Sequence, residues 1–334
     1  MTPPPGYSDL TPQHVLDALD AVGLRGDGRI LQLNSYENRV FLVMLEDGRG
    51  VVAKFYRPGR WSDAQIVEEH AFALELAAAE VQVVPPLVLE ARPGVPGLVL
   101  QGEPPTLACL NGHRFAVAAR CAGREPELDD PETLRQLGRF IGRLHAVGRR
   151  RRFEHRHRLD AHRDGRRAMA LLLDGGFVAR DVEPAWRQAC AQALAAVEAA
   201  FDAAAPLAML RLHGDCHIGN VLWRDGAPNV VDLDDAMQGP AVQDLWMLVS
   251  GDADTLVRQR ETLLDGYIQF MDFDRRELAL VEPLRTLRMV RHAAWLAERW
   301  SDPTFPLNFP YFGSSAYWSQ QVTQLREQLE AMQP

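Results

Sequence analysis

Cysteine, lysine and long hydrophobic runs are all scarce in this chain of 334 residues. Its four cysteines show no CxxC spacing and are too few to staple a secreted protein of this length. The longest apolar stretches, Val81–Leu89 and Ala189–Ala205, are shorter than the roughly 20 residues that a membrane-spanning helix needs. Residues 1–10 contain no basic segment followed by an apolar one, so we expect no secretory signal. These absences predict a cytoplasmic protein without a membrane partner.

The charge balance excludes a further class of protein. With 45 acidic and 36 basic side chains, the net charge of −9 argues against a dedicated nucleic-acid-binding protein. Only one of the 36 basic residues is a lysine, Lys54. Because a compact ammonium and a planar guanidinium are not interchangeable in a tight site, we interpret Lys54 as a position where arginine cannot serve. The alternative is a lysine that survived by chance.

Hydrophobic periodicity predicts an α+β chain whose character changes near residue 120. Residues 1–120 are expected to form a lobe built around an antiparallel sheet. The expected helices there are Pro12–Val22 and Ala64–Ala79, and the expected strands are Gly28–Leu33, Arg39–Leu45, Gly50–Tyr56, Val81–Leu89, Leu98–Leu100 and Phe115–Ala119.

Residues 121–130 are rich in Gly, Pro and acids and are the predicted linker. Residues 131–334 are expected to form a mainly helical lobe with a small β insert. The expected helices are Pro131–Val147, Arg166–Leu173, Pro184–Ala203, Val242–Ser250, Thr255–Met271, Glu277–Trp300 and Ser315–Met332, and the short apolar runs are Met209–Leu212, Val221–Trp223 and Asn229–Leu233.

The densest polar cluster is the run HGDCHIGN at residues 213–220, followed by a strand-like run and then DLDD at residues 232–235. Two short strands flanking a loop would hold Asp215, Asn220 and Asp232 close together. Carboxylate and amide oxygens are hard ligands suited to Mg²⁺. The order of an Asp, an Asn five residues later and an Asp after the next strand matches the phosphoryl-transfer template of kinases.

This H-G-D-x-H-x-x-N motif resembles that of the aminoglycoside phosphotransferase and choline kinase branch of the protein-kinase-like fold. Lys54 ends the run VVAK, which is similar to the kinase strand element whose lysine contacts the α- and β-phosphates. The segments that also resemble the stress response kinases of this branch are LNSYENR (33–39), KFYRP (54–58), LHGDCH (212–217), DLDDA (232–236), GPAVQDLWM (239–247) and FPLNFP (305–310). The resemblance extends from about Thr11 to Trp318 and implies a bilobal fold with a nucleotide-binding N-terminal lobe.

The resemblance implies a role for each matched residue. Asp215 would be the catalytic base, and Asn220 and Asp232 would bind Mg²⁺. Lys54 would hold the α- and β-phosphates of ATP, and Glu69 on the following helix would fix Lys54.

The neighbouring Glu68 stays open as the partner of Lys54. Ser35 would lie in the loop over the nucleotide. That loop, Asn34–Arg39, departs from the kinase pattern because it contains no glycine. If it covers phosphate, it does so with the Ser35 hydroxyl and backbone N–H groups.

The resemblance implies an ATP- and Mg²⁺-dependent serine/threonine protein kinase that is cytoplasmic and monomeric. Its acceptor would be a protein hydroxyl, or its own by autophosphorylation. A small-molecule hydroxyl kinase with an aminoglycoside, choline or homoserine-like acceptor stays open, because this fold serves both kinds of acceptor. A nucleotide-binding pseudokinase is the third hypothesis, although every catalytic position is filled.

Several other groups admit a structural and a functional interpretation. His213, Cys216 and His217 suggest zinc, but no second ligand cluster accompanies them, so His213 is expected to brace the loop. Asp234 and Asp235 would either support the site or be solvated, and Asp244 would either cap a helix or brace the loop. The basic block 148–167, with nine Arg and three His against three acids, is a solvated face or an anchor for an acidic substrate. The C-terminal aromatic residues are expected to be core rather than a ligand wall; they are Trp295, Trp300, Phe305, Phe309, Tyr311, Phe312 and Trp318.

Overall fold

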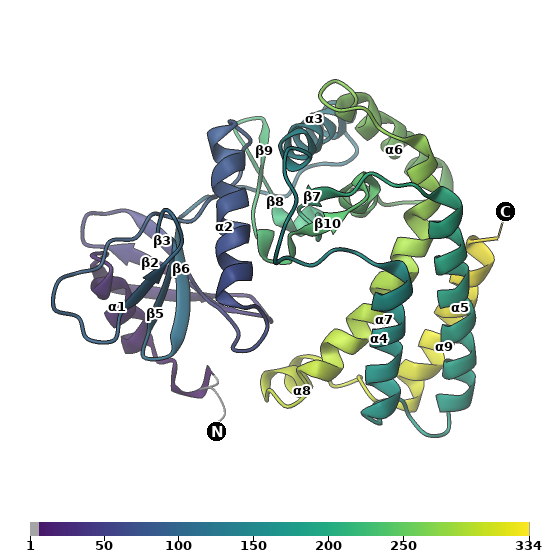
Figure 1. Cartoon of the computed structure of the whole chain (residues 1–334), viewed down its shortest axis with the longest axis horizontal. Helices are drawn as coiled ribbons and strands as arrows, with labels where there is room; N and C mark the ends of the chain where they lie inside the picture. The colour runs from purple at the N-terminus through teal and green to yellow at the C-terminus, as the bar shows by residue number, and fades with distance from the viewer. Residues whose placement is uncertain (1–6, 334) are drawn as a thin grey trace. The chain divides into compact units, whose positions relative to one another are not determined.

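The computed structural model describes residues 7–333 and divides into two compact units. The first unit contains the residues up to His157 together with Arg211–Met237 and Met247–Asp272. The second unit contains Arg158–Leu210, Gln238–Trp246 and the residues from Phe273 onward. Figure 1 shows the helices and strands of both, and each unit has its own hydrophobic core.

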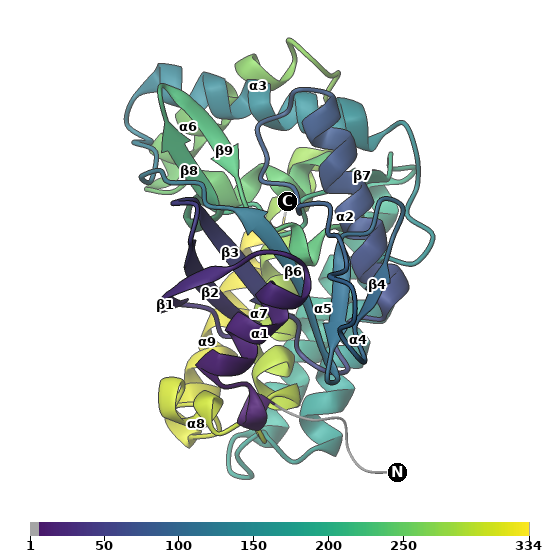
Figure 2. The same cartoon turned by 90° about the vertical axis from the view of Figure 1, so that its left-hand side faces the viewer.

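The first unit begins with a six-stranded antiparallel sheet in the order β1-β2-β3-β6-β5-β4. Its strands are β1 (Gly26–Leu33), β2 (Arg39–Leu45), β3 (Gly50–Phe55), β4 (Val99–Gln101), β5 (Leu107–Leu110) and β6 (His113–Ala119). The helix α1 (Pro12–Ala21) begins after Thr11, whose side chain accepts the N–H of His14. Figure 2 shows α1 lying across one face of the sheet, where Val15 and Leu19 join the core.

The strand β3 determines where Lys54 lies. Ala53 and Phe55 are buried in the core shared with α1, and Lys54 between them projects to the opposite face of the sheet. Because β3 is flanked by β2 and β6, this lysine lies in the middle of the sheet rather than at an edge.

The remaining elements of the first unit include the two polar runs, residues 213–220 and 232–235. They are α2 (Asp63–Ala78), α3 (Pro131–Gly148), β7 (Leu210–Leu212), the short turn η2 (Ile218–Asn220), the hairpin of β8 (Val221–Arg224) and β9 (Ala227–Val230), the turn η3 (Leu233–Asp235) and α6 (Ala253–Tyr267). The helices α3 and α6 pack with their backbones in contact, because a Cβ at Gly138 would lie 1.9 Å from the carbonyl oxygen of Leu263. In the predicted linker, Arg124 exchanges two backbone hydrogen bonds with Trp223 of β8, at 3.0 and 2.7 Å.

The second unit is built around helices that run side by side (Figure 1). They are α4 (Ala161–Asp174), α5 (Glu183–Ala204), α7 (Val281–Glu298) and α9 (Ser315–Ala331). The unit also contains the short helix α8 (Thr304–Asn308) and the turns η4 (Ala241–Asp244) and η6 (Arg275–Leu280), and β10 (Met237–Gly239) has residues in both units. Trp186 and Trp318 meet edge to face in its core at 5.4 Å, and Phe305 and Phe312 are buried beside them. The C-terminal aromatic residues are therefore largely core, with Tyr311 half-exposed.

The structure confirms the predicted α+β class, with an antiparallel N-terminal sheet and a helical C-terminal part. Two expected elements are wrong. Val81–Leu89 is not a strand and makes only isolated bridges at Val83 and Pro86, because two consecutive prolines remove the N–H groups that a ladder needs. Val242–Ser250 is not a helix but the turns η4 and η5 (Trp246–Leu248). The strand β5 and the short helix α8 were not predicted from the sequence. No helix within residues 7–333 is both long and apolar enough to cross a membrane.

Candidate active site

The loop between β7 and β8 is organised by His213, which is fully buried. Its Nε2 donates to the carbonyl oxygen of Val231 at 2.9 Å, and its Nδ1 accepts the backbone N–H of Asp215 at 3.3 Å. Both ring nitrogens of His213 are therefore engaged by the backbone on either side of the loop. His213 thus fixes the backbone of Asp215 against the segment that leads to Asp232, as the bracing interpretation expected.

Asn220 completes this connection from the other end of the loop. Its Nδ2 donates to the carbonyl oxygen of Asp215 at 3.0 Å, and its own carbonyl oxygen accepts the N–H of Val231 at 3.0 Å. The His217 Nε2 lies 3.5 Å from the Asp215 carboxylate. Asp215, Asn220 and the residue before Asp232 are therefore joined by one short hydrogen-bonded network.

Gly214 allows the loop to approach the turn η3. Its φ of +87° favours glycine, and a Cβ at this position would lie 2.2 Å from the carbonyl oxygen of Asp235. Asp232 also has a left-handed backbone, with φ +63°, as it leaves β9. These two turns bring the two acidic segments of the motif together.

Lys54 meets the second of these segments directly. Its Nζ donates to Asp232 Oδ1 at 2.7 Å and lies 3.9 Å from Asp234 Oδ1. Burial alone would lower the pKa of Lys54, but the carboxylates of Asp232 and Asp234 outweigh it and raise that pKa well above its usual range. The ammonium is therefore charged at every physiological pH.

Glu68 and Glu69 on α2 have different environments. Glu69 is buried, with its carboxylate 3.6 Å from the His70 ring, and its burial, only partly offset by the charge of Lys54, raises its pKa to about 7. Glu68 instead accepts the backbone N–H groups of residues 154–156. Among residues 7–333, the carboxylates within 4 Å of the Lys54 ammonium belong to Asp232 and Asp234 rather than to either glutamate.

The loop that carries Ser35 is held by side chains. The Ser35 hydroxyl accepts the N–H of Asn38 at 3.3 Å, and the Asn38 amide oxygen accepts the N–H of Arg57 at 3.1 Å. The Arg57 guanidinium donates to the carbonyl oxygens of Tyr36 and Glu37 at 3.1 and 3.0 Å. The structure thus adds Asn38 and Arg57 to the site; both lie in runs that carried the family resemblance, which was the available signal.

Asp232 and Asn220 could together hold a divalent metal ion. The carboxylate of Asp232 is half exposed, and Asn220 uses its amide nitrogen within the loop, which leaves its amide oxygen as the atom for a metal. Among residues 7–333, no three His, Cys, Asp or Glu side chains are arranged so that they could hold a metal ion, so the zinc interpretation finds no support there. The rings of His213 and His217 both accept backbone N–H groups of this loop.

The structure also shows the surroundings of Asp234, Asp235, Asp244 and the basic block 148–167. Asp234 is buried and Asp235 pairs with Arg60, so neither is merely solvated. Asp244 is fully buried at the end of η4, where no α-helix follows for it to cap. The basic block is not one surface, because Arg156 is buried whereas residues 149–152 are exposed.

Comparison with known proteins agrees with this geometry. The model of the phosphotransferase enzyme family matches residues 29–281. This chain belongs to the phosphotransferase enzyme family. Stress response kinase A of Escherichia coli (strain K12) is 41% identical over 327 residues, which cover 98% of this chain and 95% of that protein. Serine/threonine protein kinase RdoA of Salmonella typhimurium (strain LT2) is 41% identical over 326 residues, with 98% and 94% of the two chains covered.

Solved structures share the fold of this phosphotransferase. The amicoumacin kinase hAmiN, in complex with AMP-PNP, Ca²⁺ and Ami, has a TM-score of 0.70 at 18% identity, covering 97% of this chain and 94% of that chain. A microcompartment-associated aminopropanol kinase has a TM-score of 0.69 at 18% identity, covering 96% and 98%. The protein is thus an enzyme that transfers phosphoryl groups to an alcohol.

Proposed function

We propose that this phosphotransferase is a magnesium-dependent serine/threonine protein kinase that uses ATP. The observation that carries the proposal is the network in which His213 and Asn220 hold Asp215 beside the segment of Asp232, the residue that contacts Lys54. The 41% identity over nearly the whole chain to a protein named serine/threonine protein kinase supports the protein acceptor. The names of the relatives also support a role in stress response, and a cytoplasmic location suits the four free cysteines.

In this proposal each residue acts on one part of the transfer. Asp215 orients the acceptor hydroxyl and takes its proton as the new P–O bond forms and the bond to the ADP oxygen breaks. Lys54 contacts the α- and β-phosphates, and Asn220 and Asp232 hold Mg²⁺, which would neutralise phosphate charge. Ser35 and the backbone of its loop cover the nucleotide.

Glu68, Glu69 and the two lobes also have distinct roles in this proposal. Glu69, buried near Lys54, orients that ammonium, whereas Glu68 holds the segment 154–156. Residues 1–120 bind the nucleotide, residues 121–130 link the lobes and residues 131–334 carry the catalytic loop and the acceptor site.

The test is incubation with labelled ATP and Mg²⁺, with and without dephosphorylated casein as a generic acceptor. The wild type is compared with Asp215→Asn and with Asp225→Asn, a matched control in the exposed β8–β9 turn. We expect label on protein from the wild type and the control, and a loss of about 10³-fold in Asp215→Asn with nucleotide binding preserved.

Other outcomes separate the rival functions. Transfer to hydroxyl compounds but not to protein would replace the protein acceptor with a small molecule, as in the amicoumacin and aminopropanol kinases that share the fold. ATP binding without transfer to any acceptor would indicate a pseudokinase.

A further inference from the structure

A buried ion cluster lies beside the residues assigned so far. The guanidinium of Arg60 contacts three carboxylates: Glu37 Oε2 at 2.9 Å, Asp234 Oδ2 at 3.2 Å and Asp235 Oδ1 at 2.5 Å. We propose that Arg60 is a positioning residue that joins the nucleotide-covering loop to the Asp232 segment and keeps Asp234 from capturing the Lys54 ammonium. This inference rests on the proposed use of ATP and Mg²⁺.

The three acidic residues that contact Arg60 come from different parts of the sequence. Glu37 belongs to the loop 34–39, whereas Asp234 and Asp235 form the turn η3 that follows Asp232. Arg60 itself lies between β3 and α2. One guanidinium therefore connects three segments that are far apart in the sequence, two of which contribute to the proposed nucleotide site.

The second step is electrostatic. Asp234 is buried, with 6% of its side chain exposed. Within residues 7–333, the side-chain cations within 4 Å of its carboxylate are Lys54 and Arg60. Lys54 is the more distant of them, at 3.9 Å against 3.2 Å. A buried carboxylate that loses one counter-charge draws more strongly on the other. Without Arg60, Asp234 would pull the Lys54 ammonium toward itself and away from the nucleotide phosphates.

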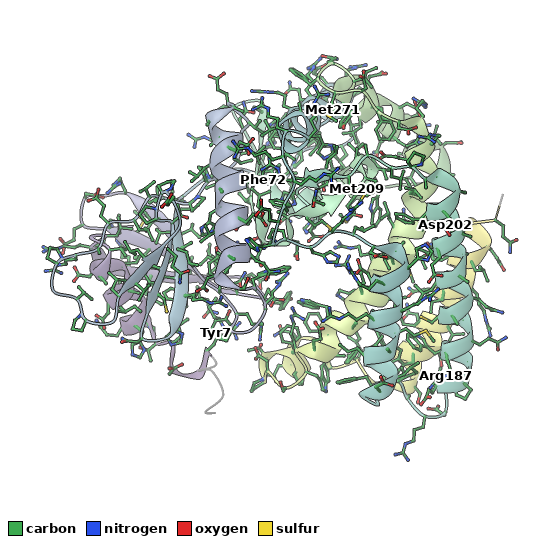
Figure 3. All side chains as sticks on the ribbon, in the orientation of Figure 1. Tyr7, Phe72, Arg187, Asp202, Met209 and Met271 are labelled. Atoms are coloured by element: carbon green, nitrogen blue, oxygen red, sulfur yellow. The ribbon has the colours of Figure 1, made fainter. Side chains whose placement is uncertain are left out.

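The third step is the rigidity of the loop. Because residues 34–39 contain no glycine, their position depends on side-chain contacts rather than on an adaptable backbone. The hydroxyl of Tyr7, labelled in Figure 3, donates to the carbonyl oxygens of Glu37 and Phe55 at 3.2 and 3.1 Å. Asn38 Nδ2 donates to Asp234 at 3.2 Å, so it shares with Arg60 the link between loop and turn.

The fourth step is that further contacts hold Arg60 and its turn. Two guanidinium groups lie over the Trp61 ring, that of Arg60 at 5.1 Å and that of Arg156 at 4.1 Å from the ring centre. Arg156 in turn donates to the carbonyl oxygens of Asp234 and Ala236. The planar fork of arginine suits a contact with several carboxylates, which a single ammonium cannot reproduce.

The experiment measures binding of AMP-PNP with Mg²⁺ by calorimetry, without any acceptor, for four proteins: wild type, Arg60→Ala, Asp234→Asn and the double variant. We expect Arg60→Ala to raise Kd by about 10-fold or more, because a buried charge loses its partner. The double variant should recover to within about 3-fold of Asp234→Asn, because the competing carboxylate is then neutral. A purely structural role for Arg60 would not give this recovery.

Arg299→Ala is the matched control. Arg299 is buried to a similar degree and pairs with Glu298 at 2.9 Å in the second unit, so its loss should leave Kd within about 2-fold. If Arg60→Ala does not fold, Arg60→Lys is used instead. We expect its Kd to exceed that of the wild type, but by less than the about 10-fold expected for Arg60→Ala.

The possible failures are distinguishable. No binding by the wild type would contradict the proposed function. Wild-type binding that Arg60→Ala or Arg60→Lys leaves unchanged, or equal losses in Arg60→Ala and the double variant, would overturn the positioning role alone.

Discussion

Asp215, the proposed base, is held through its backbone. His213 and Asn220 contact the backbone of Asp215 rather than its carboxylate. This arrangement fixes the position of Asp215 and keeps its carboxylate out of these two hydrogen bonds, which suits a reaction that depends on positioning. Lys54 is held differently, by an ion pair between its ammonium and the carboxylate of Asp232. Its position therefore depends on its charge.

Replacing Lys54 with arginine tests whether geometry matters beyond charge. Lys54→Arg keeps the positive charge but puts a wider group where Nζ lies 2.7 Å from Asp232 and 5.9 Å from the Tyr56 ring. We expect kcat/KM for ATP to fall by about 10²-fold while the melting temperature changes by only a few degrees. Steady-state kinetics and thermal melting measure both quantities.

The control for that substitution is Arg49→Lys in the exposed β2–β3 turn, which should leave kcat/KM unchanged. An unchanged rate in Lys54→Arg would show that the single lysine of the chain is an accident of composition.

The element that decides the site is the loop between β7 and β8 rather than a long helix or strand. It approaches η3 so closely that there is no room for a Cβ at Gly214. Strands β8 and β9 then carry the chain from Asn220 to Asp232 with four residues each and a two-residue turn. The spacing of the motif is therefore the length of one short hairpin.

Gly214→Ala should disrupt this approach. Its Cβ would meet the carbonyl oxygen of Asp235 at 2.2 Å, so the loop or η3 must shift. We expect a loss of about 1–3 kcal/mol in the free energy of unfolding and at least a 10-fold loss of kcat, measured by urea denaturation and phosphoryl transfer.

Gly226→Ala separates backbone strain from the clash. Gly226 has a similar φ of +79° in the β8–β9 turn, but nothing lies within 4 Å of its Cβ position. Gly226→Ala should therefore lower the free energy of unfolding by about 1 kcal/mol and leave kcat unchanged. Equal loss of activity in both variants would contradict the importance of the close approach at Gly214.

At the scale of the whole molecule, two separate cores stabilise the fold, and the second contains an unusual acid. Glu277 in η6 is buried, and its carboxylate accepts the N–H of Val242 at 2.9 Å, which holds η4. Burial raises the pKa of Glu277 from 4.5 to about 7. The folded protein therefore binds a proton between these values that the unfolded chain has released.

This difference makes the stability of the molecule depend on pH. The pKa of Glu277 is higher in the folded protein than in the unfolded chain, so ionising Glu277 lowers the free energy of unfolding. This loss of stability is absent below about pH 4.5, grows between pH 4.5 and 7, and is complete above pH 7. Glu277→Gln should thus raise the free energy of unfolding by at most about 3 kcal/mol above pH 7 and by nothing near pH 4.5. Urea denaturation at both pH values measures the difference, and an equal effect at both would contradict the assignment.

The order of residues along the chain was enough to predict the α+β class, most of the helices and the closeness of Asp215 and Asn220 to the segment of Asp232. These features depend on local periodicity and on a spacing set by one hairpin, both of which are written in the sequence. The expected strand at Val81–Leu89 and the expected helix at Val242–Ser250 were wrong. At Val81–Leu89 two consecutive prolines prevent the strand, a local signal that the apolar run outweighed in the prediction. At Val242 the backbone is held by the distant carboxylate of Glu277, which the local sequence does not encode.

Only the tertiary structure showed that Lys54 pairs with Asp232 and Asp234 and that Arg60 joins Glu37 to η3. The sequence separations are long, and a charged residue read in isolation has many possible partners. Which partner it meets is decided when the sheet, α2 and the β8–β9 hairpin pack together and exclude water, because burial then makes unpaired charge costly.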